Sequence, residues 1–169
     1  MTTRYVIGCD PGLGGAFAVL HIGDDGAAIV ERCEDLPKVG AKVRGKRKQK
    51  IDAGGLVRLV RDLAAARPIS GAIVEAVNAA PGMGVSGAFS FGRGAGIIEA
   101  ALIAAGIVPE FVAPAVWKRA MRAPADKRLS RARATELFGG SDAHWPLSRH
   151  DGRAEAAMVA LYGVKAGVI

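Results

Sequence analysis

Aromatic residues are scarce in this sequence: they make up 5% of its 169 residues, although half of the chain is hydrophobic by type. Much of that half is alanine and valine, which favours helices packed closely on a sheet and argues against a disordered or fibrous chain. No apolar run reaches the roughly 18 residues of a membrane-spanning helix, and residues 1–4 lack the apolar stretch of a signal peptide. We expect a single cytoplasmic domain spanning residues 1–169, with no membrane association.

Cysteine is almost absent as well. Cys9 and Cys33 lie in apolar, strand-like runs and do not form a C-x-x-C pair. We interpret them as two small buried residues in a reducing compartment, with a disulfide between them as the alternative.

Positive charge, in contrast, is in excess. Lysine and arginine number 23 against 16 acidic residues, which gives a net charge of +7 and a pI near 9.8. A pI above about 9 is one mark of nucleic-acid binding, although many basic proteins bind none. A run without any acid contains seven of the cations: Lys38, Lys42, Arg44, Lys46, Arg47, Lys48 and Lys50. We expect residues 37–51 to form a flexible basic loop, either simply solvated or an arm that follows phosphates and orders on DNA.

Apolar periodicity predicts five strands, at residues 5–10, 16–20, 28–33, 71–77 and 108–113. It predicts helices at residues 52–67, 88–105, 126–138 and 149–165, and a short helix from residue 114. The order predicts an α/β domain with a mixed five-stranded sheet, three antiparallel strands and then two further strands, flanked by helices. This arrangement matches the ribonuclease H-like fold, although element order alone fits many α/β folds.

Four acids occupy positions that are expensive for ordinary carboxylates. Asp10 ends an apolar strand and Glu75 interrupts another, and a buried charge is costly unless it is paired or bound to a metal. Asp151 and Glu155, spaced i,i+4, share one face near the start of the last helix. Simpler interpretations exist for each: a turn residue for Asp10, an arginine partner for Glu75, and helix-start acids for the other two.

Converging carboxylates are hard oxygen ligands of the kind that Mg²⁺ selects. Two Mg²⁺ ions about 4 Å apart can activate a water and stabilise the leaving oxygen in phosphodiester cleavage. With the basic surface, the four acids therefore predict a nuclease with two Mg²⁺ ions per site and Mn²⁺ as a substitute. Such chemistry needs no nucleophilic side chain. His150, beside Asp151, is either a ligand or proton donor, or an exposed helix-start residue.

Several segments resemble the motifs of one family. Residues 7–12 (IGCDPG) and 15–19 (GAFAV) resemble the first motif of RuvC-type Holliday-junction resolvases, and residues 73–75 resemble their second acidic strand. Residues 150–157 resemble the C-terminal acidic helix of RuvC-like resolvases of phages and chloroplasts. Residues 89–94 and 114–118 are also similar to the chloroplast branch. The resemblance covers nearly the whole chain.

The resemblance implies a structure-selective endonuclease that resolves four-way DNA junctions by paired, symmetrical nicks. It implies that Asp10, Glu75, Asp151 and Glu155 are catalytic and bind the metal, and that Lys127 acts catalytically near the scissile phosphate. The spacing of four between the last two acids is that of the chloroplast type; bacterial RuvC usually has three.

The sequence also departs from bacterial RuvC, which carries an aromatic wedge shortly after the second acid. Residues 78–80 read Asn-Ala-Ala at that place. We therefore expect the wedge to come from elsewhere, with Met83, Phe89 and Phe91 as candidates.

Predicted DNA contacts come from three regions: Lys46, Arg47, Lys48, Phe91, Arg93, Lys118, Arg128 and Arg131. Lys127, Arg128, Arg131 and Arg133 form a basic cluster on one predicted helix, and such a cluster would make affinity depend strongly on salt. Trp117 with Lys118 can stack on a base and hold a phosphate; the alternative is a partly buried helix-start tryptophan. His144 and Trp145 are either structural or DNA-facing.

Glycines at positions 92, 94 and 96 do not follow a strand, as a dinucleotide fingerprint requires, so we expect no nucleotide cofactor. They suit a close approach of two helices in a homodimer, whose twofold symmetry fits that of a junction.

Three other functions compete. One is a ribonuclease H-like enzyme that cuts RNA–DNA hybrids, and another is a non-catalytic DNA-binding module. The third is an ATPase or sugar-kinase-like domain, for whose duplicated domain a chain of 169 residues leaves no room.

Overall fold

A mixed five-stranded sheet forms the centre of the computed structural model, which describes residues 4–43, 45–76, 78 and 82–169. Its strands are β1 (Arg4–Asp10), β2 (Ala16–Ile22), β3 (Ala28–Asp35), β6 (Ile69–Glu75) and β7 (Pro109–Val112), in the order β3-β2-β1-β6-β7. The first three strands pair antiparallel, and β6 and β7 add in parallel. The predicted sheet is therefore confirmed.

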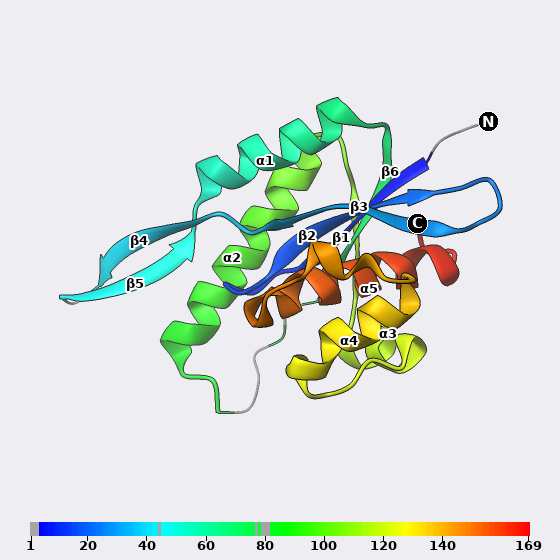
Figure 1. Cartoon of the computed structure of the whole chain (residues 1–169). Coiled ribbons are helices and arrows are strands. Elements are labelled where there is room, and N and C mark those ends of the chain that lie inside the picture. Colours follow the sequence, from blue (N-terminus) through cyan, green and yellow to red (C-terminus); the bar gives the residue numbers. More distant parts are fainter. Residues whose placement is uncertain (1–3, 44, 77, 79–81) are drawn as a thin grey trace.

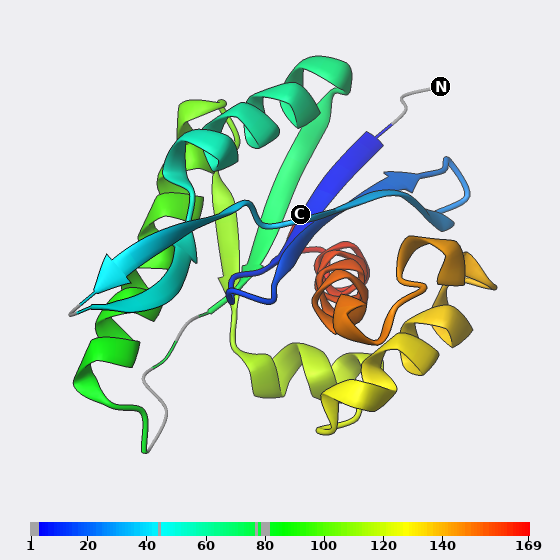
Figure 2. The same ribbon diagram turned by 60° about the vertical axis from the view of Figure 1, so that its left-hand side comes forward.

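Helices cover both faces of this sheet (Figure 1 and Figure 2). One face carries α1 (Ala53–Ala66) and α2 (Val85–Ala104), and the other carries α3 (Pro114–Met121), α4 (Ser130–Leu137) and α5 (Asp151–Lys165). Short 3-10 turns stand at Lys127–Leu129, Ser141–His144 and Ser148–His150. No helix in the described part of the chain is both long enough and apolar enough to cross a membrane.

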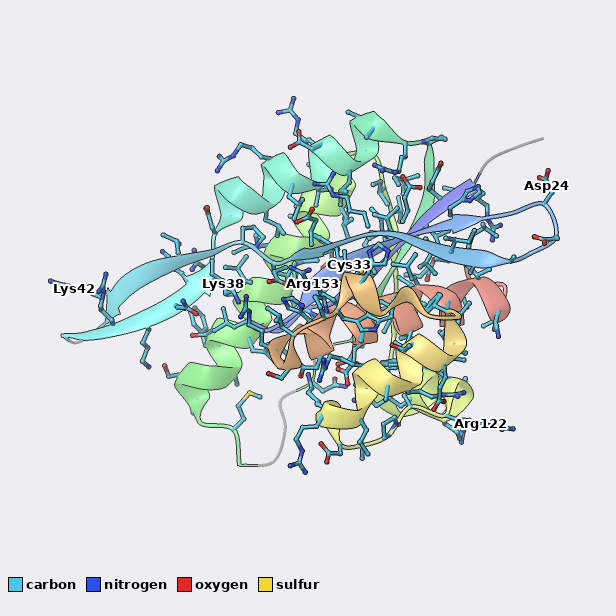
Figure 3. The ribbon with its side chains drawn as sticks, in the orientation of Figure 1. Asp24, Cys33, Lys38, Lys42, Arg122 and Arg153 are labelled. Atoms are coloured by element: carbon cyan, nitrogen blue, oxygen red, sulfur yellow. The ribbon has the colours of Figure 1, made fainter. Side chains whose placement is uncertain are left out.

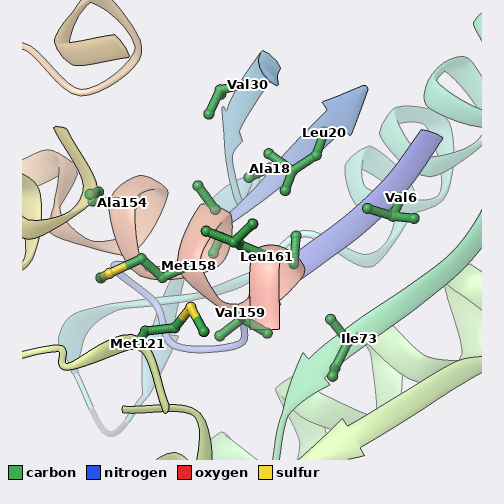
Figure 4. Packing of buried hydrophobic residues seen from close by; sticks show 14 of the residues in the cluster. Val6, Ala18, Leu20, Val30, Ile73, Met121, Ala154, Met158, Val159 and Leu161 are labelled. Carbon is green, nitrogen blue, oxygen red and sulfur yellow. The ribbon is translucent and has the colours of Figure 1, made fainter. Parts of the chain in front are cut away.

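Alternation along the strands divides the core between these two faces. Val6 packs in the α5 layer, and its neighbour Ile7 packs in the α1–α2 layer, because successive strand residues point to opposite faces. Figure 4 shows the α5 layer, in which Leu20 and Ile73 of the sheet belong to the same core cluster as Leu161 of α5. Burial of this kind contributes about 25 cal/mol per Å² of apolar surface.

Helix α5 is buried along most of its length and lies directly on β1. The contact is possible because position 8 is a glycine. A Cβ at Gly8 would lie 2.1 Å from the carbonyl oxygen of Ala156 and 2.6 Å from the backbone nitrogen of Ala160. Any side chain there would push the helix off the strand, so Gly8 fixes the position of α5 over β1.

The segment expected to be a flexible basic loop is instead an antiparallel hairpin of β4 (Lys38–Val43) and β5 (Lys46–Ile51). Backbone pairing stabilises it: Lys38 lies opposite Ile51, whose side chain is 6% exposed and belongs to the core. A glycine at position 45 with φ of 77° supplies the left-handed conformation of the turn. Arg44 lies outside the described residues. The prediction of a loop was wrong because it relied on the density of positive charge and gave too little weight to a weak alternating pattern of apolar residues.

Smaller differences concern element ends. Helix α2 begins at Val85, three residues before the prediction of residue 88, and the predicted helix 126–138 is divided into a 3-10 turn and α4. Of the predicted strand 71–77, Val77 lies outside the described residues. Both cysteines are free, as predicted. Cys9 is buried, whereas Cys33, also predicted to be buried, is only partly so.

Candidate active site

Asp10 is the last residue of β1 and is 5% exposed. The turn that follows is very tight: the amide of Gly15 donates to the carbonyl of Gly12 at 2.9 Å. A Cβ on Gly15 would lie 1.9 Å from the carbonyl oxygen of Asp10. The amide of Gly12 also donates to Oδ1 of Asp10 at 3.4 Å. The Asp-Pro-Gly turn therefore orients the carboxylate, and Asp10 is a turn-forming residue as well as a site residue.

The first turn of α5 abuts this same loop, which brings two further acids to it. A Cβ on Gly152 would lie 2.3 Å from the carbonyl oxygen of Gly14 and 2.9 Å from Cα of Gly15. Asp151 begins the helix and is partly exposed, whereas Glu155, one turn later, is 1% exposed. Contact between two glycine-containing segments thus places Asp151 and Glu155 beside Asp10.

Glu75 ends β6, the parallel neighbour of β1, where Val74 pairs with Cys9. Its carboxylate therefore lies at the same edge of the sheet as Asp10. The indole Nε1 of Trp117 donates to Oε2 of Glu75 at 2.7 Å, and the Trp117 side chain is fully buried. Of the two interpretations of Trp117, the structure supports the buried one, and it adds a role in orienting Glu75 that the sequence did not indicate.

Two lysines and a serine contact the buried carboxylate of Glu155. Its Oε1 lies 3.2 Å from Nζ of Lys118 and accepts a 2.9 Å hydrogen bond from Oγ of the buried Ser130. Its Oε2 lies 3.2 Å from Nζ of Lys127, and the same nitrogen is 3.7 Å from Oδ2 of Asp10. Lys127 is therefore a cation placed between two of the acids.

The acids influence one another electrostatically. Burial raises the pKa of Asp10; Lys127 opposes this rise, and Glu155 and Asp151 add to it. Burial also raises the pKa of Glu75, where the bond from Trp117 acts the other way. Desolvation tends to lower the pKa of Lys127, but the surrounding acids outweigh it and bring that pKa to about 12. Lys127 thus carries its charge among Asp10, Glu155 and Asp151, and Glu75 interacts with Asp10 and Glu155.

As they stand, no three histidine, cysteine or acidic side chains within the described residues are close enough together to hold a metal ion. The donor chemistry is nevertheless that of a hard cation, since all four groups offer carboxylate oxygens. The position between Asp10 and Glu155, where such a cation would reduce their repulsion, is taken by Lys127.

An arginine that sequence reasoning missed ties α5 to β3. Nε of Arg153 donates to Oδ1 of Asp35 at 2.6 Å, and Nη1 donates to the carbonyl of His144 at 3.3 Å. Arg153 lies beside β3 and close to Cys33 (Figure 3). Nothing in the sequence pattern indicated a partner 118 residues away.

His150 and Trp145 are buried, and His144 is partly exposed. His150 is 5% exposed and its Nδ1 accepts from the amide of Leu147 at 3.3 Å, so the interpretation as an exposed helix-start residue was wrong. Trp145 is 1% exposed and donates to Oγ1 of Thr135 at 2.9 Å, which makes it structural.

Residues predicted to contact DNA fall into two groups. Arg47, Lys48, Phe91 and Arg93 lie on β5 and α2, which contact each other away from α3 and α4. The side chain of Lys46 lies outside what the structure describes. Lys42 is near the far end of the hairpin and Lys38 at its base (Figure 3).

The predicted DNA contact Lys118, on α3, and the predicted basic cluster of Lys127, Arg128, Arg131 and Arg133 have partners within the protein. Lys118 is turned to Glu155, and Arg128, with 89% of its side chain exposed, pairs with Asp126. Arg131 is partly buried and donates to the carbonyl of Trp145 at 3.4 Å. Arg133 donates to the carbonyl of Met121 and pairs with Glu136.

No family model and no curated protein matches the sequence. Solved structures do match. Thermus thermophilus RuvC in complex with a Holliday junction substrate has a TM-score of 0.65 at 16% identity, over 98% of this chain and 96% of that chain. Thermus thermophilus RuvC has a TM-score of 0.64 at 17% identity, over 96% of each chain. The yeast mitochondrial Holliday junction resolvase has a TM-score of 0.58 at 13% identity, over 95% of this chain and 78% of that chain. The predicted resemblance to RuvC-like resolvases is thus confirmed as a likeness of structure, and the chain has the ribonuclease H-like fold of RuvC.

Proposed function

We propose that this protein is a Mg²⁺-dependent endonuclease that resolves four-way DNA junctions by paired, symmetrical nicks. One observation carries the proposal: the carboxylates of Asp10 and Glu155 flank the ammonium group of Lys127. Asp151 and Glu75 are close enough to act electrostatically on Asp10. A RuvC-like fold supports the choice of substrate, since one similar structure holds a Holliday junction.

The four acids would hold two Mg²⁺ ions, with Mn²⁺ as a substitute. Burial raises the pKa of Asp10 and Glu75, so keeping these carboxylates ionised in the absence of a metal is energetically unfavourable. When bound, the ions would activate a water and stabilise the leaving oxygen. Lys127 is 55% exposed and its exposed stem can turn outward, so its Nζ can move from the acids to a substrate phosphate.

The remaining residues of the site position these groups. Trp117 orients Glu75, and Ser130 with Lys118 fixes Glu155, which leaves its Oε2 free to turn to a metal once Lys127 has moved. We propose that residues 1–169 act as one catalytic domain in a homodimer, with no nucleotide cofactor. The two free cysteines agree with a reducing, cytoplasmic location.

A substrate panel tests the function. The protein is incubated with Mg²⁺ and, separately, with a synthetic four-way junction, a linear duplex and an RNA–DNA hybrid of the same sequence. We expect paired nicks at symmetrical positions of the junction alone, and no nicks when Asp10 is replaced by Asn. Cleavage of the hybrid in preference to the junction would support the ribonuclease alternative, and binding without cleavage would support the non-catalytic one.

A further inference from the structure

A groove runs between β5 and the first half of α2, outside the carboxylate site. It consists of two adjoining pockets of about 390 Å³ and 330 Å³. They share six lining residues: Lys48, Gln49, Lys50, Ile51, Ser90 and Gly94. The larger pocket also reaches residues 11–13, the turn that directly follows Asp10. One end of the groove therefore adjoins the candidate active site.

The pocket beside the turn is mainly apolar. Leu13, Ile51, Met83 and Phe91 contribute its hydrophobic wall, and a few polar groups, such as Ser86, lie at its border. Small-ligand sites have this character, with apolar walls and a small number of polar groups that fix orientation, in volumes of about 300–1,000 Å³. Phe91 offers the ring against which a flat heterocycle can stack.

The outer pocket is cationic. Every charged side chain among the described residues that line it is positive: Lys42, Lys48, Lys50 and Arg93. Phe89, 73% exposed, stands beside them. A row of cations with an exposed aromatic side chain is the combination by which proteins hold the phosphates and bases of single strands.

The hairpin itself indicates a polyanionic partner. Its register places Lys42 directly opposite Arg47, and like charges in that relation destabilise a strand pair. Lys48 and Lys50 add to the same charge from the neighbouring positions of β5. A bound phosphate chain would relieve this repulsion, whereas an apolar or basic partner would not.

We propose that this groove receives one unstacked nucleotide of the DNA substrate. Its base enters the apolar pocket against Phe91, its phosphates follow Lys48, Lys50 and Arg93, and an adjacent phosphate is thereby delivered to Asp10. This inference rests on the proposed nuclease function and adds a base-reading subsite to it. The position of the cut along the strand is then set by which base fits the pocket.

Base-deletion scanning tests the subsite by binding alone. Four-way junctions are prepared with one abasic site at each position near the cut, and their affinity for the intact Asp10→Asn chain is measured without metal. We expect one abasic position to weaken binding about tenfold, within the range for loss of one base–aromatic stack. The same position should have no effect in Phe91→Leu, which keeps the apolar volume, and should keep its effect in Phe91→Tyr, which keeps the ring.

Ile29→Ala serves as the control, since Ile29 is 58% exposed on β3 and lines neither of the two described pockets. The proposed subsite would be overturned if each abasic site changed the affinity equally whether position 91 is Phe, Leu or Tyr. If the junction is nicked in Mg²⁺ and no position depends on Phe91, the subsite fails and the nuclease function stands. If no nucleic acid is cut, the proposed function itself fails.

A second measurement does not depend on folding of a variant. 5-Iodouracil at the sensitive position should crosslink to the peptide that contains Phe91, and a crosslink only to α4 would contradict the proposal.

Discussion

Replacing Gly152 with alanine should separate the acids without touching any of them. The new Cβ would lie 2.3 Å from the carbonyl oxygen of Gly14, about 1 Å closer than an ordinary contact of 3.4 Å or more. The obstructing atoms are backbone atoms of a tight turn, so they cannot rotate away, and α5 must shift. Overpacking of this kind costs about 1–3 kcal/mol, and a displacement of about 1 Å in a catalytic group can reduce the rate by about 10²-fold.

The assay combines thermal unfolding with Mg²⁺-dependent nicking of a four-way junction. We expect a lower Tm, by about 2–4 °C for each kcal/mol in a chain of this size, and a loss of nicking larger than the loss of folded protein. Gly54→Ala on α1 is the matched control, because its Cβ would meet nothing closer than 3.4 Å, and helix propensity predicts a gain of up to about 1 kcal/mol. Unchanged Tm and nicking in Gly152→Ala would refute the idea that this contact positions Asp151 and Glu155.

Three further predictions concern other parts of the molecule. Trp117→Phe removes the 2.7 Å hydrogen bond to Glu75. We expect a loss of about 1–3 kcal/mol in unfolding free energy and weaker Mn²⁺ binding, measured by calorimetry. Unchanged Mn²⁺ affinity would contradict the role of Trp117 in orienting Glu75. Burial raises the pKa of Asp10 from its ordinary value of 3.8, so the stability from its protonation is present below 3.8 and is lost as pH rises through the raised pKa. The Tm of Asp10→Asn, measured without metal, should therefore rise relative to that of the original chain as the pH is raised from 3.8 through the raised pKa of Asp10. A difference in Tm that is constant with pH would show that burial of the ionised carboxylate does not destabilise the fold. Lys42→Ala combined with Arg47→Ala should reduce the slope of log affinity against log salt concentration by about 0.9 for each phosphate that the hairpin no longer neutralises. The control Arg61→Ala on α1 should leave the slope unchanged. Equal slopes in the double variant and the original chain would show that the hairpin is not part of the DNA-binding surface.

The sequence was sufficient to predict the sheet because its strands are clear runs of apolar residues. Buried runs such as that of β1 read as strands in isolation, and Asp10 and Glu75 stood out because a charge in such a run needs an explanation. The pairing of β1 with β6 then brings the two acids together. The assignment of Asp151 and Glu155 followed from helical spacing, which the helix of α5 preserves.

What the sequence could not indicate are contacts between distant segments. No local pattern links Trp117 to Glu75, or Ser130 to Glu155, since the first pair depends on how α3 lies against β6 and the second on how α4 packs against α5. The hairpin was missed for a different reason: seven closely spaced cations suggest a solvated loop. The hairpin is attached to the core by the buried side chain of Ile51, at the end of β5.

A crystal structure of the protein grown with Mn²⁺ tests most directly whether the carboxylates form a site for divalent metal. We expect anomalous density at about 2.0–2.3 Å from oxygens of Asp10 and Glu155, distances expected for a hard divalent ion, with Nζ of Lys127 moved out from between them. Density for Lys127 still bridging these two acids at 3.7 and 3.2 Å, with no metal peak at saturating Mn²⁺, would contradict it.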